Sequence, residues 1–264
     1  MIRVGVLGAA GRMGRMVCRA VADDPELSLV AAVSPSSAGR PIADLIGPTD
    51  LDFTVSDDLN ALATAAVEVG VDFTTSQAVM ANVHTLIEHG IHAVVGTTGM
   101  GPKDLAEIER LASGANSNVI VAPNFAIGAV LMQRFATEAA RVLPAAEIIE
   151  LHHEDKPDAP SGTARATAER MAKARVTDST APSSETIEGA RGADVSGIRV
   201  HAVRLPGLVA HQEVIFGGTG EVLSIRHDSL DRVSFVPGVL LAIKAVADRP
   251  GFTLGLEPIL GLDA

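Results

Sequence analysis

The sequence opens with an apolar run that leads directly into a glycine-rich turn, VGVLGAAGRMG. Residues 2–7 have the apolar, β-branched composition of a strand, and a helical pattern follows over 12–22. Gly8, Gly11 and Gly14 lie between the two, where glycine allows a tight turn and lets a helix start approach a pyrophosphate closely. The segment predicts a βα unit that binds a dinucleotide, although the same glycines are compatible with an ordinary βα turn.

The first half of the chain repeats this alternation. Further strands are expected at 27–33, 51–55, 71–74, 91–95 and 118–122, and further helices at 58–69, 77–89 and 102–113. Alternation of strands and helices is typical of βαβ units around a parallel sheet. We therefore predict an α/β fold whose first part is a Rossmann-like, doubly wound parallel sheet.

The second half has a different pattern. Helices are expected at 126–142, 163–174 and 229–248, and strands at 146–151, 197–205, 211–218 and 221–228. The GGTG segment between the last two strands predicts a hairpin, and Pro237 is expected to kink or restart the last helix. Residues 176–197 are rich in Ser, Thr, Gly and charge, which predicts a long loop or lid. We predict a second α+β domain built on a mixed or antiparallel sheet.

Composition argues against several classes of function. With 21 Lys and Arg against 32 Asp and Glu, the net charge of −11 disfavours binding to nucleic acid or to an anionic membrane surface. No apolar run reaches the roughly 18 residues of a membrane span, and the N-terminal segment has the pattern of a strand rather than of a signal peptide. Cys18 is the single cysteine, so an internal disulfide is impossible and a cytoplasmic location is expected.

Further cofactor candidates follow the expected strands, because doubly wound sheets bind ligands beyond the carboxyl ends of their strands. Ser34 stands where an acid usually holds the adenosine ribose, and a 2′-phosphate would be repelled less without that acid. This favours NADPH, or use of both NADPH and NADH, unless Ser34 merely caps a turn. VVGTTG and VAPNFAIG could likewise be ordinary turns. The cofactor-binding candidates are Gly8, Ala9, Ala10, Gly11, Arg12, Met13, Ser34, Gly96, Thr97, Thr98, Ala122, Pro123, Asn124 and Phe125.

The segment LHHEDKPDAPSGTA concentrates cations just before a helix start. His152 and His153 end an expected strand, so both can serve one site only if the chain turns there, and the two following prolines make a turn plausible. Lys156 lies in the same loop, and Ser161 is suited to cap the next helix, whose free N–H groups attract anions. The segment predicts a site for a dicarboxylate in which an imidazole or the ammonium could deliver a proton. A structural histidine pair and a solvated lysine are the alternatives.

Two other kinds of chemistry are disfavoured. The HHED segment offers zinc ligands, but it lacks the helical spacing of a zinc site and a nearby lysine repels a cation, so no metal site is predicted. Cys18 falls within the apolar pattern of the first helix, which disfavours a cysteine nucleophile.

Six segments taken together resemble the dihydrodipicolinate reductase family. They are GAAGRMG, VDFT, VVGTTG, APNFAIG, ELHHEDKPDAPSGTA and RGADVSGIRVHAVRLPGLVAHQEVIFG. The resemblance runs from residue 2 to about residue 260, and GARGADVSGIRVHAVR and HDSLDRVSFVPGVLLA look closest to actinobacterial members. It implies reduction of 4-hydroxy-tetrahydrodipicolinate to tetrahydrodipicolinate with NADPH and/or NADH, in lysine and diaminopimelate biosynthesis.

The resemblance also implies roles for single residues. His152 is expected to donate or accept a proton, and Lys156 to be the other catalytic or substrate-binding group. Contacts to the substrate are expected from His153, Ser161, Gly162 and Thr163.

The domain organisation and the partners expected from the resemblance are as follows. Residues 1–124 and 233–264 are expected to form a discontinuous dinucleotide-binding domain, and 125–232 a domain for substrate binding and oligomerisation. A homotetramer built through the second sheet is expected, with a small cyclic dicarboxylate as substrate and with neither nucleic acid nor membrane as partner.

Two other classes of function stay open. A semialdehyde or homoserine dehydrogenase has a similar plan, but the former needs a nucleophilic cysteine at the start of the second domain, and none occurs there. A dinucleotide-sensing protein would keep the glycine loop but would not need the cationic segment.

Overall fold

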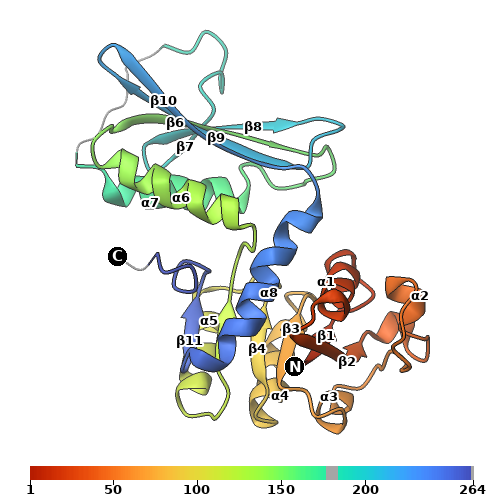
Figure 1. Cartoon of the computed structure of the whole chain (residues 1–264). Helices are drawn as coiled ribbons and strands as arrows, with labels where there is room; N and C mark the ends of the chain where they lie inside the picture. Colours follow the sequence, from red (N-terminus) through yellow and green to blue (C-terminus); the bar gives the residue numbers. More distant parts are fainter. Residues whose placement is uncertain (177–183, 263–264) are drawn as a thin grey trace. The chain divides into compact units, whose positions relative to one another are not determined.

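The computed structural model describes residues 1–176 and 184–262, and the chain forms two compact units. Unit 1 comprises Met1–Phe125 and Phe235–Ala264, and unit 2 comprises Ala126–Ser234. Figure 1 labels most helices and strands of both units.

Unit 1 is built on a parallel sheet of six strands. They are β1 (Ile2–Leu7), β2 (Leu27–Val33), β3 (Val69–Asp72), β4 (His92–Val95), β5 (Val119–Val121) and β11 (Phe252–Leu254). Their order is β11-β5-β4-β3-β1-β2, and each pairing is parallel. The predicted doubly wound sheet is confirmed. Because β1 has β2 on one side and β3 on the other, the loop after β1 lies at the point where the strand order reverses, where such sheets bind ligands.

Each main helix of unit 1 has apolar residues three or four positions apart, and these form the face that packs on the sheet. The helices are α1 (Arg12–Asp23), α2 (Ala43–Ile46), α3 (Asn60–Thr64), α4 (Val79–Glu88), α5 (Pro102–Ser113) and α8 (Val236–Ala245), with short 3₁₀ turns at η1 (Pro35–Ser37) and η3 (Val246–Asp248). Helix α1 packs beside α8, and α4 beside α5. Val17, Cys18 and Val21 form the buried face of α1, where burial raises the pKa of the Cys18 thiol to about 12.

Two predicted elements of unit 1 are wrong. Residues 51–55 form no strand, because their backbone bonds to the loop at 39–42 instead of to the sheet: Ile42 N–H donates to Phe53 O at 3.0 Å, and Val55 N–H to Arg40 O at 2.9 Å. The helix expected at 58–69 is reduced to α3, since Ala66 adopts a left-handed φ of 48° and Val69 already begins β3. The three-residue strand β11 was missed.

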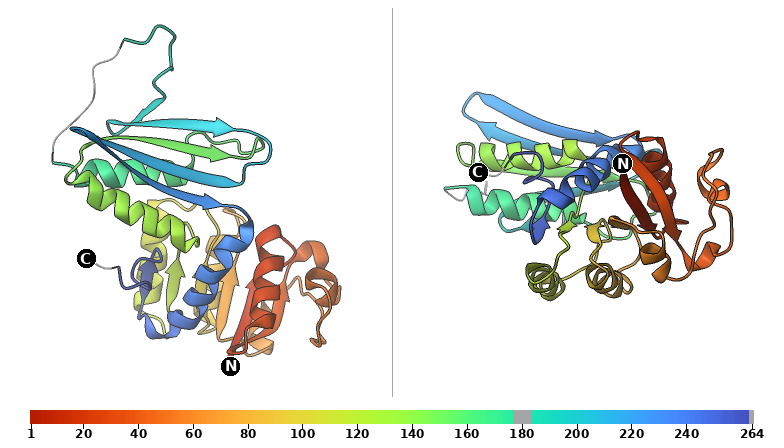
Figure 2. Two further views of the ribbon diagram at one scale, coloured as in Figure 1. Left: turned by 45° about the horizontal axis from the view of Figure 1, so that its top comes forward. Right: turned by 60° about the horizontal axis from the view of Figure 1, so that its bottom comes forward.

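Unit 2 consists of a five-stranded sheet with two helices on one face (Figures 1 and 2). Its strands are β6 (Ala145–His152), β7 (Ala193–Val195), β8 (Ile198–Arg204), β9 (Ala210–Gly218) and β10 (Glu221–Ser229), in the order β10-β9-β6-β8-β7. The pair β6–β8 is parallel and the other pairs are antiparallel, which confirms the expected mixed sheet. The helices α6 (Ile127–Ala140) and α7 (Gly162–Ala174) pack together, and their alanines and Met171 bury Ile148, Val200, Val214 and Phe216 of the sheet.

The hairpin predicted at GGTG joins β9 to β10, with Gly220 at a φ of 77°. The loop predicted at 176–197 contains the short strand β7, and its residues 177–183 lie outside the described residues. The helix predicted at 229–248 is divided into η2 (Arg232–Phe235), α8 and η3. Pro237 lies in the first turn of α8, where its missing N–H leaves no intrahelical bond unmade, so this proline restarts the helix.

Among the helices described, none is both long and apolar enough to cross a membrane.

Candidate active site

The glycine loop after β1 has the backbone of an anion cradle. Gly8 has a φ of 77°, and a Cβ on it would collide with the carbonyl oxygen of Phe73. A Cβ on Gly14 would collide with the carbonyl oxygen of Gly8, so both positions require glycine. Gly11 caps α1 without a side chain, which leaves the first N–H groups of the helix available to a ligand. This loop therefore fits the pyrophosphate of a dinucleotide.

Three more loops at the same edge of the sheet are joined to this one. The backbone of Phe73, after β3, lies close to Gly8. The ring of Phe73 contacts the ring of Phe125, after β5, with the ring centroids 5.8 Å apart and the ring planes at 54°. Thr74 N–H donates to Thr97 Oγ1 at 2.8 Å. Segments after β1, β3, β4 and β5 thus meet within unit 1, which brings together most of the predicted cofactor residues.

A buried carboxylate that the sequence analysis did not select holds two of these loops. Asp72, at the end of β3, is fully buried. Its Oδ1 accepts hydrogen bonds from Thr97 Oγ1 at 2.5 Å, Thr74 Oγ1 at 2.8 Å and Thr74 N–H at 3.0 Å. Its Oδ2 accepts from Asn82 Nδ2 at 2.7 Å. Asp72 therefore fixes the ends of β3 and β4 to α4.

The remaining predicted cofactor residues differ in exposure. Arg12, Thr98 and Pro123 are exposed, whereas Ala10, Met13, Gly96 and Asn124 are partly buried and Ala9 and Ala122 are buried. Ser34 directly follows β2, and its buried hydroxyl lies 3.2 Å from Ser36 Oγ. Arg40 is ion-paired with Asp44 at 3.3 Å.

In unit 2, the cationic segment forms a turn between β6 and α7. His152 is the last residue of β6, and Lys156 N–H donates to the carbonyl oxygen of His153 at 3.2 Å, which reverses the chain. Ser161 caps α7, because its Oγ accepts from Ala164 N–H at 3.2 Å. Gly162 and Thr163 are the first residues of the helix, exposed and partly buried respectively.

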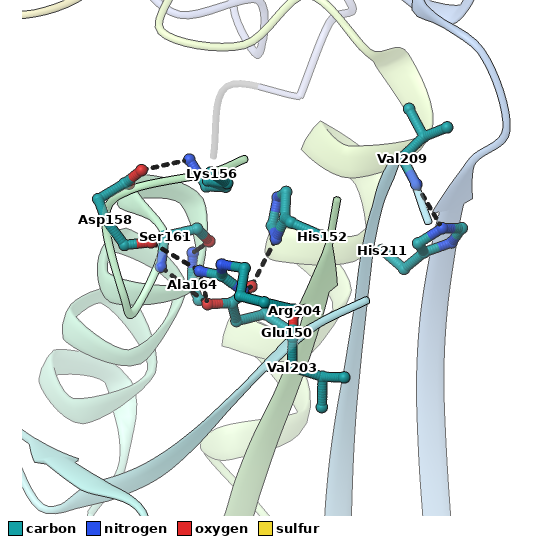
Figure 3. Close-up of polar contacts among 10 residues, drawn as sticks. All are labelled: Glu150, His152, Lys156, Asp158, Ser161, Ala164, Val203, Arg204, Val209 and His211. Carbon is teal, nitrogen blue, oxygen red and sulfur yellow. Dashed lines mark hydrogen bonds and ion pairs between the residues drawn. The ribbon is translucent and has the colours of Figure 1, made fainter. Parts of the chain in front are cut away.

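The turn is organised around Glu150, whose side chain is fully buried (Figure 3). Glu150 Oε2 lies 2.5 Å from His152 Nδ1, and Arg204 of β8 donates to both carboxylate oxygens at 2.8 and 2.9 Å. Burial acts to raise the pKa of Glu150, but the hydrogen bonds from His152, Arg204 and the Ser161 N–H outweigh it and hold that pKa below its ordinary value.

Lys156 is linked to the same cluster. Its Nζ donates to Asp158 Oδ1 at 2.7 Å, which holds the pKa of Asp158 below its ordinary value. Arg204 Nη2 donates to the carbonyl oxygen of Asp158 at 2.6 Å. His152, Lys156 and the start of α7 are therefore brought together through the side chains of Glu150, Asp158 and Arg204.

A second histidine of this sheet is held differently. His211 of β9 has Nδ1 2.7 Å from Asp228 Oδ1. Its Nε2 accepts from Val209 N–H at 3.2 Å, the contact drawn in Figure 3. Both ring nitrogens are thus engaged by the protein, whereas His152 contacts Glu150 through Nδ1.

Comparison with known proteins identifies the family. Residues 2–125 match the family described as "Dihydrodipicolinate reductase, N-terminus", and residues 128–260 match "Dihydrodipicolinate reductase, C-terminus". The chain belongs to the dihydrodipicolinate reductase family.

Relatives in the family match the chain over nearly its whole length. A 4-hydroxy-tetrahydrodipicolinate reductase of Nocardia farcinica is 51% identical, with 99% of both chains covered. That of Mycobacterium marinum is also 51% identical, with 99% of this chain and 100% of the relative covered. The solved structure of dipicolinate-bound dihydrodipicolinate reductase from Paenisporosarcina sp. TG-14 is 41% identical, with a TM-score of 0.87 and with 98% of this chain and 99% of that one covered.

The predicted family, fold and activity are confirmed. The chain is a nicotinamide-dependent oxidoreductase that reduces 4-hydroxy-tetrahydrodipicolinate in lysine and diaminopimelate biosynthesis, with NADPH and/or NADH as cofactor. An amine dehydrogenase from Mycobacterium smegmatis, 17% identical with a TM-score of 0.63, shares the fold alone.

Two residues of the reductase that hold the cationic turn from neighbouring strands, Glu150 of β6 and Arg204 of β8, were missed from the sequence. Alternate residues of a strand share a face, so Glu150 lies on the same face of β6 as the buried Ile148. A charged residue at a position expected to be buried could have indicated a functional role for Glu150. Arg204 lies within a quoted segment but is 54 residues from Glu150, and the parallel pairing of β6 with β8 was not predictable from either strand.

Proposed function

We propose that the turn between β6 and α7 binds the dicarboxylate substrate and supplies the proton of the reduction. His152 is the proton-transferring residue, and Lys156 and His153 hold the substrate with Ser161, Gly162 and Thr163. The observation that carries this proposal is the Glu150-centred cluster, which places an imidazole beside the N-terminal end of an anion-attracting helix.

The cofactor belongs to unit 1 in this proposal. The glycine loop with Arg12 holds the pyrophosphate, Ser34 lies toward the adenosine ribose, and the segments at 96–98 and 122–125 lie toward the nicotinamide. When bound, the cofactor supplies the hydride. Units 1 and 2 are accordingly the dinucleotide-binding domain and the substrate domain.

Residues of the protein supply the proton of the reduction and offset the negative charge of the substrate. Reduction takes up a hydride and a proton and releases water, and the substrate carries two carboxylates throughout. Lys156 and the N–H groups at the start of α7 offset these negative charges. His152 first takes up a proton from solvent on Nε2, the ring nitrogen that Glu150 does not bind, and then delivers that proton to the substrate, which leaves the neutral imidazole with its hydrogen on Nδ1.

We also propose a cytoplasmic homotetramer that forms through the face of the second sheet turned away from α6 and α7. This face holds a cavity of about 510 Å³ lined by Ile149 and Ile215 among others. Val222, in the same phase of β10, is 71% exposed. Sedimentation equilibrium should give four chains per particle, and a monomer at micromolar concentration would contradict this assembly.

The reaction is tested directly with freshly prepared substrate and purified protein. Oxidation of NADPH and of NADH is followed by absorbance, and the product is identified by mass spectrometry. His152→Gln should lower kcat more than it raises KM, by on the order of 10²-fold, because general acid catalysis contributes at least that much. An effect on KM alone would reduce His152 to a binding residue.

A further inference from the structure

We propose that Glu150 is a positioning residue that fixes the tautomer and orientation of His152 and ties its imidazole to the start of α7. The proposal rests on the proposed function, in which His152 transfers the proton. In this proposal, one buried carboxylate holds both the proton donor, His152, and the first turn of the helix that binds the substrate.

The carboxylate of Glu150 is saturated with donors. Its Oε1 accepts from Ser161 N–H at 3.1 Å and from Arg204 Nη2 at 2.8 Å. Its Oε2 accepts from Arg204 Nη1 at 2.9 Å and is 2.5 Å from His152 Nδ1. Four contacts match the roughly four lone-pair sites of an ionised carboxylate, so each donor is held in one geometry.

This arrangement decides which nitrogen of His152 faces the ligand. An ionised carboxylate only accepts hydrogen bonds, so Nδ1 must carry a hydrogen and Nε2 is left for the substrate. Without this partner the ring could flip, and both tautomers would be populated. Arg204 adds a second constraint, because it also binds the carbonyl oxygen of Asp158, the residue that pairs with Lys156.

Groups from several elements surround the pair. Arg204 comes from β8 and the Ser161 N–H from the start of α7, and both bind Glu150. Asp158, in the turn between β6 and α7, accepts from Arg204 through its carbonyl oxygen and pairs with Lys156 through its side chain. On β9, the residue paired with Glu150 is the uncharged Gln212, which bonds to Thr167 of α7. Arg204 is thus the permanent cation that balances the buried carboxylate.

The chain offers a matched control on the same strand. Glu147 lies three residues earlier on β6, on the opposite face, and also binds a histidine and an arginine: His201 Nε2 at 2.8 Å, and Arg191. Its side chain is 38% exposed and lies outside the proposed substrate site, on the sheet face proposed for tetramer contacts, so the control is used after its tetramer has been verified by sedimentation. Glu147→Gln therefore reports any general effect of neutralising a paired carboxylate in this sheet.

The informative variant is Glu150→Gln. Its amide NH₂ must face one of the present donors, and among these only the imidazole can change from donor to acceptor by exchanging tautomers. We expect His152 to convert to the Nε2–H tautomer, in which Nδ1 accepts from the amide and cannot hold the second hydrogen that proton delivery requires. The variant should lose kcat by on the order of 10²-fold, with NADPH affinity unchanged and with Glu147→Gln close to wild type. Arg204→Lys should retain folding but give a smaller loss, because a lysine cannot bind both oxygens at once.

The tautomer is measured by ¹⁵N NMR of selectively labelled histidine, with His152→Gln assigning the signal. When its imidazole is neutral, the wild-type protein should show the Nδ1–H form, and this measurement needs neither an activity assay nor a Glu150 variant. A wild-type mixture of tautomers would overturn the proposal, as would equal losses of kcat in Glu150→Gln and Glu147→Gln. If the fixed tautomer is found but His152→Gln keeps full kcat, the proposed role of His152 fails while the placement by Glu150 stands.

Discussion

Lys156 carries a positive charge in the turn after β6, and Asp158 holds its ammonium at 2.7 Å. Replacing Lys156 by Met should lower kcat/KM by about 30- to 1,000-fold, since a charge-assisted contact in a desolvated site is worth about 2–4 kcal/mol. NADPH affinity, measured by fluorescence titration, should not change. Lys173→Met, an exposed site in the last turn of α7, is the control. A Lys156 variant as active as this control would remove Lys156 from the site.

Ser34 bears on the choice of cofactor. A carboxylate after β2 would repel a 2′-phosphate and accept bonds from the free ribose hydroxyls. Ser34→Asp should therefore shift the ratio of NADPH to NADH affinity toward NADH by about tenfold or more, on the order of 1.4 kcal/mol. Titration of both cofactors against both proteins tests this. A wild type with strong NADH preference would mean that the ribose lies elsewhere.

The candidate residues illustrate what a sequence can and cannot indicate. Gly8 and Gly14 follow from their spacing, because the turn admits no Cβ there. Ser161 follows from its place before an alanine-rich helix. The partnership of Glu150 with Arg204 depends on a strand pairing across 54 residues, which no local pattern records.

At the scale of elements, Asp72 connects β3, β4 and α4. Asp72→Ala would leave buried donors on Thr74, Thr97 and Asn82 without an acceptor, at a cost of about 2–5 kcal/mol in the free energy of unfolding. NADPH affinity should weaken by about tenfold, because the loops at the cofactor edge lose their common anchor.

Asp72→Asn is the matched variant for this test. It keeps Oδ1, and Asn82 can turn its own amide to face the new NH₂ group, so the loss of stability should be clearly smaller. Urea unfolding and NADPH titration of both variants give the comparison. Equal loss in the two would show that the charge of Asp72, rather than the geometry of its bonds, holds the loops.

Elements with a strong apolar period were predictable, whereas those decided by backbone pairing were not. β1, β2 and α5 lie at the predicted residues. Residues 51–55 have the composition of a strand, but their hydrogen bonds go to a neighbouring loop. β11 has three residues, too few to show a period, and exists because β5 provides an edge for it.

For the whole molecule, the buried carboxylate of unit 2 links stability to pH. Because the pKa of Glu150 is lower in the folded protein than its ordinary value of 4.5, its contribution is fully present above that value. The contribution is lost as the pH falls through the folded-state pKa. The free energy of unfolding should therefore decrease as the pH falls below 4.5. Glu150→Gln should show a shallower decrease in urea titrations, and parallel curves would contradict this linkage.

The division into units could be anticipated only in part. The change from βαβ alternation to longer strands indicates a boundary after β5. The return of the chain to the first domain, expected at residue 233, came from the family resemblance, since nothing in the period of α8 indicates which sheet it covers. In the structure, unit 1 resumes at Phe235.

Because Cys18, the single cysteine of the sequence, is buried, the rate of its alkylation reports how often helix α1 opens. Alkylation needs a thiolate, and a side chain with no exposed surface and a pKa of about 12 reacts only when α1 leaves the sheet. The ratio of iodoacetamide rates in native and unfolded protein thus measures the free energy of that opening. NADPH should slow the reaction, because the same helix begins at the glycine loop. A rate indifferent to NADPH would mean that α1 opens without releasing the cofactor.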